Sequence, residues 1–241
     1  MVRITSWLVL LAVLLAALLG FPVFESGTYI ERFETDSYYL DYCLHIPDGA
    51  TKNMPLIVFL HGDAQNWEVT ALKNREIIQN LRAIYGDAFP FIVLSPSTRE
   101  HSWTDGEIPS ALMQLIDATA EKYCVDRNRI IVTGFSRGAV GVWWLASNYP
   151  DRFSLAVPVS CDDEFKVDPA TLTSVPIIAY VGDSRNDYGR FGERMTELVD
   201  GANTNGGNAT LTVLENTNHS QTCAAAYNEY LFERMLDSDK N

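Results

Sequence analysis

Short apolar segments alternate with helical segments along most of this 241-residue chain, and this alternation restricts the fold more than any other feature. Apolar, β-branched runs occur at 56–60, 91–94, 129–133, 155–159, 176–181 and 210–214. The earlier segments 29–33 and 38–46 are typical of an antiparallel pair. Short, continuously apolar strands separated by helices predict a mostly parallel central sheet with helices on both faces.

Apolar residues recur with helical spacing between these runs. Such faces predict helices near 67–82, 112–123, 139–149, 191–199 and 224–235. No linker, charge run or repeat interrupts residues 27–241, so we expect a single domain there. Ligands of such sheets bind beyond the carboxyl ends of the strands, so the residues that follow each strand are the site candidates.

The run 129–133 is followed by Gly134-Phe135-Ser136-Arg137-Gly138 and then by a predicted helix. A sharp strand-to-helix turn pushes its central side chain out of the sheet, and glycines two positions away avoid collision with the neighbouring backbone. The pattern alone is weak, but its position between strand and helix makes Ser136 the candidate nucleophile. The alternative is an ordinary glycine-rich turn with a surface serine.

A serine nucleophile needs a base, and His219 is the only histidine after Ser136. It lies between the last strand and the last helix, which agrees with the chain order serine, acid, histidine. The acid should follow the run 176–181, where both Asp183 and Asp187 are available. A more remote alternative is the acidic group after the previous strand, Asp162, Asp163 and Glu164. Asp183 is close enough to the strand to cap the turn, so we prefer Asp187.

The tetrahedral intermediate of such chemistry carries a negative oxygen and needs N–H donors. The backbone N–H of Arg137 is one candidate, and the N–H of Asp63, after Gly62, is the second. His61 is then expected to hold this loop through side-chain hydrogen bonds. Trp103 follows the run 91–94 and could stack on an aromatic acyl group or a sugar, although tryptophan packs in cores more often.

The N-terminus differs from the rest of the chain. Arg3 precedes an apolar run at 7–19, which predicts that residues 1–26 form a secretory signal peptide. An uncleaved membrane anchor is the alternative, because Phe21 and Phe24 could extend the run towards the about 20 residues that span a bilayer. We therefore expect a protein that is secreted or anchored outside the cytoplasm by this segment.

The formal net charge of −13 disfavours nucleic acid as a partner, and disfavours membrane binding by charge alone. Four cysteines at wide spacing argue against a metal site. Their even number permits disulfides outside the cytoplasm, with free buried thiols as the alternative. No metal and no organic cofactor is expected.

Several segments together resemble secreted polyhydroxybutyrate-depolymerase-like and feruloyl-esterase-like α/β-hydrolases. They are Leu-His-Gly-Asp-Ala-Gln-Asn at 60–66, Val-Asp-Arg-Asn-Arg-Ile at 125–130, Leu-Ala-Ser-Asn-Tyr-Pro-Asp-Arg-Phe at 145–153, Val-Pro-Val-Ser-Cys at 157–161, and 219–236. The resemblance covers most of residues 55–236 and implies an α/β-hydrolase fold with little or no cap domain. It also implies hydrolysis of carboxylic esters through an acyl-enzyme, without a cofactor.

Two positions depart from that family pattern. Arg137 stands where a methionine or a small residue is usual, and could bind an anionic substrate group or a neighbouring loop. Arg185 stands where the acid is usual, which leaves the choice between Asp183 and Asp187 open. Feruloyl or acetyl esters of polysaccharide and short polyesters are the expected substrates, either free or attached to polymer. A serine peptidase, an acyltransferase and a non-catalytic binding protein on a hydrolase scaffold are the rival functions.

Overall fold

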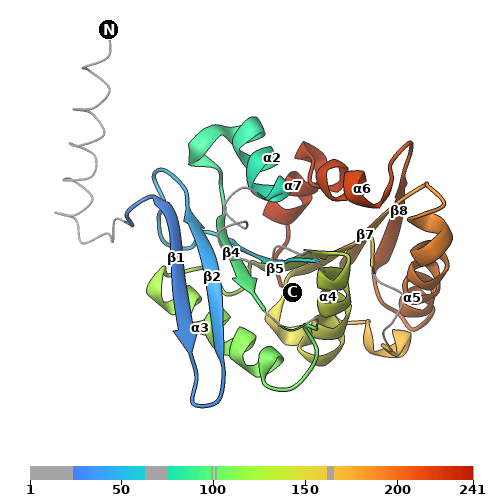
Figure 1. Cartoon of the computed structure of the whole chain (residues 1–241), viewed down its shortest axis with the longest axis horizontal. Coiled ribbons are helices and arrows are strands. Elements are labelled where there is room, and N and C mark those ends of the chain that lie inside the picture. Colours follow the sequence, from blue (N-terminus) through green and yellow to red (C-terminus); the bar gives the residue numbers. More distant parts are fainter. Residues whose placement is uncertain (1–23, 63–74, 99, 101, 162–165, 241) are drawn as a thin grey trace, which may run out of the picture.

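The computed structural model describes residues 24–62, 75–98, 100, 102–161 and 166–240, which are built around one eight-stranded sheet (Figure 1). The strand order is β1-β2-β4-β3-β5-β6-β7-β8. The strands are β1 Gly27–Glu34, β2 Tyr39–Ile46, β3 Leu56–Leu60, β4 Ile92–Ser97, β5 Ile130–Phe135, β6 Leu155–Val159, β7 Ile177–Gly182 and β8 Ala209–Leu214. Only the β1–β2 and β2–β4 pairs are antiparallel, so the prediction of a mostly parallel sheet with an antiparallel opening is confirmed.

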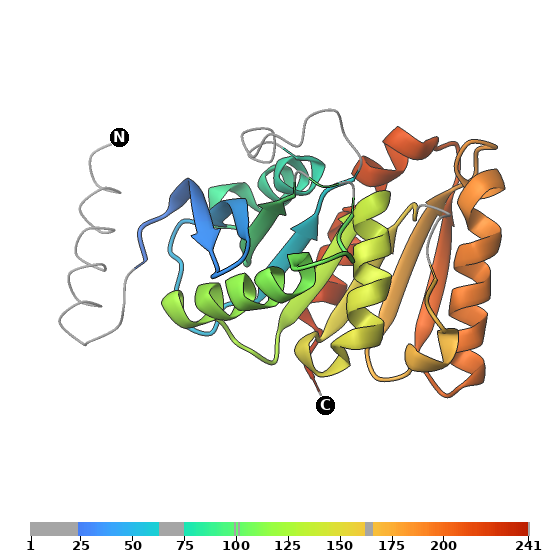
Figure 2. The same cartoon turned by 60° about the horizontal axis from the view of Figure 1, so that its bottom comes forward.

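The helices cover both faces of the sheet, as Figures 1 and 2 show. Three of them pack on one face: α3 Ile108–Lys122, α4 Arg137–Asn148 and α5 Glu193–Thr204. Three pack on the other: α2 Glu76–Tyr85, α6 His219–Ala226 and α7 Glu229–Leu236. Short turns complete the described segments: η2 Gly86–Ala88, η3 Pro150–Arg152, η4 Pro169–Thr171 and the π-helical η5 Tyr188–Gly192.

The central strands bury both of their faces, which explains their continuous apolar sequences. In β3, Leu56, Val58 and Leu60 face the core layer beneath α3 and α4, while Ile57 and Phe59 face the layer beneath α2 and α7. Burying one such side chain contributes about 1.5–3 kcal/mol. Two apolar layers therefore hold the carboxyl ends of β3, β5, β6 and β7 in fixed positions at one edge of the sheet.

The C-terminal helix predicted at 224–235 is in fact two helices. Helix α6 ends at Ala226, and α7 begins at Glu229 because the Asn228 side chain accepts the backbone N–H of Leu231 and caps a new helix. The periodicity is not interrupted at this break, since Tyr227, Leu231 and Met235 all remain buried on the same side. Spacing alone therefore could not reveal the division.

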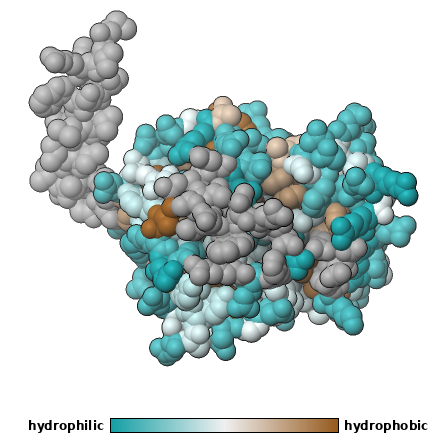
Figure 3. All heavy atoms as spheres, viewed as in Figure 1, coloured by the Kyte–Doolittle hydropathy of each residue, from teal (hydrophilic) through white to brown (hydrophobic). Residues whose placement is uncertain are grey.

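The described residues visible in Figure 3 are largely hydrophilic. No helix in the described part of the chain is long and apolar enough to cross a membrane. The predicted leader lies almost entirely outside that part. The described fold nevertheless begins before residue 27, because the Phe24 ring packs against the Tyr123 ring with their centroids 5.5 Å apart.

Candidate active site

Ser136 occupies the sharp turn between β5 and α4. Its φ of 55° and ψ of −118° lie outside the usual regions, at a cost of about 1–3 kcal/mol for a residue with a side chain. Two hydrogen bonds hold the turn: the Ser136 N–H donates to Val159 O at 2.9 Å, and Ser136 O accepts the N–H of Ala139 at 2.9 Å. The strained backbone presents the hydroxyl beyond the end of the sheet, as predicted for this strand–turn–helix.

Gly134 and Gly138 allow α4 to begin directly against β3. A Cβ at Gly138 would lie 2.0 Å from the Leu60 carbonyl oxygen, and one at Gly134 would lie 2.7 Å from the Gly138 carbonyl. No side chain can be accommodated at these distances. The close approach brings the N-terminus of α4, with its N–H groups, beside Ser136.

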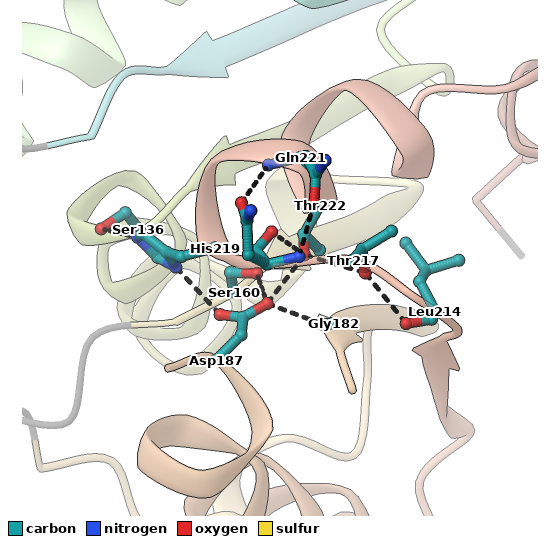
Figure 4. A network of polar contacts seen from close by, with 10 residues as sticks. Ser136, Ser160, Gly182, Asp187, Leu214, Thr217, His219, Gln221 and Thr222 are labelled. Atoms are coloured by element: carbon teal, nitrogen blue, oxygen red, sulfur yellow. Dashed lines mark hydrogen bonds and ion pairs between the residues drawn. The ribbon is translucent and has the colours of Figure 1, made fainter. Parts of the chain in front are cut away.

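His219 connects Ser136 to Asp187 (Figure 4). Its Nε2 lies 3.1 Å from Ser136 Oγ, and its Nδ1 lies 2.9 Å from Asp187 Oδ1. An ionised carboxylate can only accept hydrogen bonds, so Nδ1 carries the imidazole proton and Nε2 is left to accept the Ser136 hydroxyl proton. The tertiary structure thus brings together three residues that lie far apart in the sequence.

The backbone and the ring of His219 are both held in place. His219 is the first residue of α6, and Asn218 caps this helix through a reciprocal pair of hydrogen bonds with Gln221. The imidazole packs against the rings of Phe135 and Phe191, with centroids 4.6 and 5.1 Å away. The side chain is 29% exposed, which leaves an approach to Nε2 while the flanking rings restrict its rotation.

Asp187 is fully buried. Burial raises the pKa of this carboxyl, but hydrogen bonds from His219, Ser160, the Gly182 backbone N–H and Thr222 outweigh burial and leave its pKa below the usual value. Asp187 is therefore ionised at neutral pH. An ionised partner fixes the His219 tautomer and stabilises an imidazolium when one forms.

Asp183 makes different contacts from Asp187. Its exposed carboxylate accepts the backbone N–H groups of Asn216 and Thr217 at 2.9 and 3.2 Å. These residues lie just before His219, so Asp183 holds the loop that leads to the histidine. Of the two candidate acids after β7, the structure brings Asp187 to His219 and places Asp183 on the loop backbone. The remote alternatives at 162–164 lie outside the described residues.

One of the two predicted oxyanion donors, the N–H of Arg137, lies at the Ser136 turn. Arg137 is the first residue of α4. The first N–H groups of a helix have no acceptor within the helix, so the N–H of Arg137 is among them. Gly62 lies against the turn, because a Cβ there would be 3.1 Å from Ser136 Cβ. Asp63, the second predicted donor, lies outside the described residues.

His61 holds the end of β3, as its sequence position predicts. Its Nε2 accepts the backbone N–H of Thr98 at 3.2 Å, and its Nδ1 lies 2.8 Å from Gly62 O. The hydrogen bond from Thr98 ties β3 to the chain that follows β4. His61 is therefore a structural residue of this corner.

The expectation that Trp103 stacks on substrate is wrong. Trp103 is 1% exposed, and its indole N–H donates to His61 O at 2.9 Å. Its ring also packs against the His61 ring and against Gly141 of α4. The loop after β4 folds inward, because the indole finds both an apolar environment and an acceptor behind the site.

Sequence reasoning missed two residues that donate hydrogen bonds to Asp187, namely Ser160 and Thr222. Ser160 directly follows β6, and Thr222 lies one helical turn after His219. Both positions carry a signal that could have found them, namely the end of the strand beside β7 and the i, i+3 spacing from the histidine. Neither signal distinguishes them from other small polar residues before the path of the acid loop is known.

All four cysteines are present as thiols, and Cys43, Cys161 and Cys223 are buried. No disulfide of the kind that export would permit is therefore present in the structure. Within the described part of the chain, no group of three or more histidine, cysteine, aspartate or glutamate side chains is arranged to hold a metal ion. The polar groups around Ser136 instead form the linear chain Ser136–His219–Asp187.

Comparison with known protein families gives a match over residues 40–177 to the model of the family described as esterase PHB depolymerase. This span is more than half of the chain and includes Ser136. It ends before Asp187 and His219, so the candidate acid and the candidate base lie outside the matched span.

A poly(3-hydroxyalkanoate) depolymerase C from Paucimonas lemoignei is 27% identical over an alignment 147 residues long, which covers 55% of this chain and 34% of that protein. The chain therefore spans about a third of the length of that relative. Among solved structures, a thermostable esterase has a TM-score of 0.74 at 22% identity, over 88% of this chain and 63% of that one. A ferulic acid esterase has a TM-score of 0.65 at 17% identity, over 88% and 97% of the respective chains. These likenesses confirm the α/β-hydrolase fold.

Proposed function

Because the chain belongs to the esterase PHB depolymerase family, we propose that it is an exported serine esterase that hydrolyses carboxylic esters through an acyl-enzyme. The observation that carries the proposal is the hydrogen-bonded chain Ser136–His219–Asp187 at the carboxyl ends of the strands. In the proposed mechanism, Ser136 Oγ attacks the ester carbonyl carbon while His219 Nε2 takes the hydroxyl proton. The imidazolium then gives this proton to the departing alcohol, which leaves the acyl group on Ser136.

Deacylation repeats the same proton transfers with water. His219 Nε2 removes a proton from the water that attacks the acyl carbonyl, and then returns a proton to Ser136 Oγ. In both steps, the N–H groups of Arg137 and Asp63 are the proposed donors to the negative oxygen. The hydrogen bond from His219 to the ionised Asp187 supports the stability of the imidazolium in each step.

Hydrolysis of p-nitrophenyl acetate, p-nitrophenyl butyrate and methyl ferulate by the purified protein and by Ser136→Ala tests the proposal. Loss of the nucleophile should reduce kcat on the order of 10⁴-fold or more. Electrospray mass spectra taken during turnover of a slow ester should show an added acyl mass on the wild type only. Equal turnover by the two proteins would reject Ser136 as the nucleophile.

The substrates we propose are small-molecule or polymer-attached esters, including short polyesters and feruloyl or acetyl esters of polysaccharide. The relative named a poly(3-hydroxyalkanoate) depolymerase supports a polyester as the substrate. The fold shared with a ferulic acid esterase is compatible with a feruloyl ester as the substrate. Release of soluble acids from polyhydroxybutyrate films and from feruloylated arabinoxylan would compare the two classes. Turnover limited to p-nitrophenyl esters, with none on either polymer, would exclude attached substrates.

Export is proposed from the apolar run at 7–19, with residues 1–26 acting as a signal peptide or as a membrane anchor. Membrane contact is proposed only through this segment if it is uncleaved. If the segment is cleaved, the packing of Phe24 on Tyr123 favours a leader shorter than 1–26, which ends before Phe24, because later cleavage would remove that contact. The intact mass of the protein recovered from the medium and from the membrane fraction tests both forms.

A further inference from the structure

The Asp187 oxygen that does not bind His219 is surrounded by donors (Figure 4). Oδ2 accepts the hydroxyl of Ser160 at 2.7 Å, the backbone N–H of Gly182 at 2.6 Å and the hydroxyl of Thr222 at 2.8 Å. Asp187, Ser160 and Thr222 are all completely buried. Bulk water therefore cannot readily replace any donor that is lost, and each hydrogen bond constrains the direction of the carboxylate.

Thr222 and His219 belong to the same helix and bind the two oxygens of one carboxylate. His219 begins α6 and Thr222 lies three residues later, so both side chains project from the same side of the helix. The Thr222 hydroxyl also lies 2.9 Å from Asn218 O, but its single proton favours the charged Oδ2 as the stronger acceptor. Asp187 thus binds α6 at two points, which fixes the rotation of the helix that presents Nδ1.

Ser160 connects the acid to the strand beside the nucleophile. Its φ of 46° is unusual for a residue other than glycine, and its N–H donates to Tyr180 O at 2.8 Å. The preceding residue, Val159, accepts the backbone N–H of Ser136. The end of β6 therefore holds the backbone of Ser136 on one side and the carboxylate of Asp187 on the other.

We propose that Ser160 and Thr222 are positioning residues, whose hydroxyls hold Asp187 in line with Nδ1 of His219. The role rests on the proposed function, because positioning affects a rate only if Ser136 and His219 perform the chemistry. Neither hydroxyl contacts the reacting atoms: each acts through Asp187. Loss of either hydroxyl should lower kcat on the order of 10-fold or more and leave KM unchanged, since hydrogen bonds to a buried charge are among the strong ones.

Thr222→Val removes the hydroxyl and keeps the shape, whereas Thr222→Ser keeps the hydroxyl. We expect Val to lower kcat and Ser to restore most of it. Thr119→Val is the matched control, because the buried Thr119 hydroxyl bonds the Leu115 carbonyl one turn back in α3, far from the acid. A general effect of valine in a helix would lower kcat in this control as well.

Ser160→Gly removes the hydroxyl and also relieves the strain of the positive φ, so this variant should fold even if Thr222→Val does not. We expect kcat to fall by far more than any change in Tm explains, because relief of the positive φ offsets part of the cost of the lost hydrogen bond. Ser154→Ala is its matched control, since Ser154 is a buried serine just before the opposite end of β6. A merely structural role of Ser160 predicts instead that kcat follows stability.

A second measurement does not depend on turnover. The proton on His219 Nδ1, shared with a buried carboxylate, should give a low-field resonance in the proton NMR spectrum of the Ser136→Ala protein. Thr222→Val and Ser160→Gly should shift or broaden this resonance, whereas Thr222→Ser, Thr119→Val and Ser154→Ala should leave it in place. A wild type without esterase activity would reject the proposed function, whereas an unchanged resonance and an unchanged kcat in both hydroxyl-deficient variants would overturn the positioning role.

Discussion

Asp183 and Asp187 belong to one loop, yet their carboxylates bind different parts of the segment that carries His219. Asp187 bonds the imidazole Nδ1 at 2.9 Å, and Asp183 bonds the backbone N–H groups of Asn216 and Thr217. One aspartate thus orients the base while the other fixes the loop before it. The different roles predict different consequences of the same chemical change.

Asp187→Asn should reduce kcat on the order of 10⁴-fold, because a neutral amide in place of the carboxylate favours the wrong histidine tautomer. Asp183→Asn replaces the same group on the exposed loop, and we expect kcat to fall less than about 10-fold. Steady-state hydrolysis of p-nitrophenyl butyrate by the two variants measures both effects. A larger loss in Asp183→Asn than in Asp187→Asn would reverse the assignment of the acid.

Gly138→Ala should destabilise the fold by at least about 1–3 kcal/mol, the usual cost of overpacking, because its Cβ would meet the Leu60 carbonyl oxygen at 2.0 Å. Gly189→Ala is the control, since its Cβ would meet nothing closer than Arg185 Cγ at 3.5 Å. Urea denaturation followed by circular dichroism compares the two proteins. Equal midpoints would show that α4 can move away from β3 without cost.

Trp103→Phe should weaken the fold without changing substrate preference. The substitution leaves the buried carbonyl of His61 without its indole donor, which costs about 1–3 kcal/mol. Because Trp103 is 1% exposed, the ratio of kcat/KM for methyl ferulate to that for p-nitrophenyl acetate should stay within about 2-fold of the wild type. A selective loss of methyl ferulate hydrolysis would show that the indole reaches the substrate after all.

Acid should remove a stabilising contribution of Asp187. Its pKa is lower in the folded protein than in the unfolded chain, so the ionised carboxylate stabilises the fold above the unfolded pKa of about 4. This contribution should disappear as the pH falls from about 4 through the lower pKa of the folded state. The difference in free energy of unfolding between wild type and Asp187→Asn, measured in urea from pH 7 down to pH 3, should therefore shrink below pH 4. A difference that stays constant over this range would contradict the lowered pKa.

Local patterns were sufficient for much of the architecture. The runs 56–60 and 155–159 coincide with β3 and β6, because a strand covered on both faces must be apolar at every position. Ser136 could be singled out because the turn between β5 and α4 imposes glycines at fixed offsets. His219 could be singled out because it is the only histidine after Ser136.

The position of Trp103 and the division of the C-terminal helix could not be predicted, because local sequence patterns do not determine the path of these segments. Trp103 was expected at the site edge, but its loop turns inward, where the carbonyl of His61 accepts the indole N–H. The C-terminal periodicity continued through Asn228 because the cap separates two helices while Tyr227, Leu231 and Met235 all remain buried. For Trp103, a hydrogen-bond partner distant in the sequence decided the position of the side chain. For the C-terminal helices, a local cap decided where the first helix ends and the second begins.

The sequence by itself determined the layered sheet and the strained serine turn, because each follows from local residue patterns, and it offered only one candidate base after Ser136. Only the tertiary structure decided between Asp183 and Asp187 and revealed Ser160 and Thr222 at the second carboxylate oxygen. The physical reason is that a carboxylate four residues farther along a loop reaches a different partner. Burial then selects the position where both carboxylate oxygens find donors, and the donors from the ends of β6 and β7 and from α6 meet only after the sheet has formed.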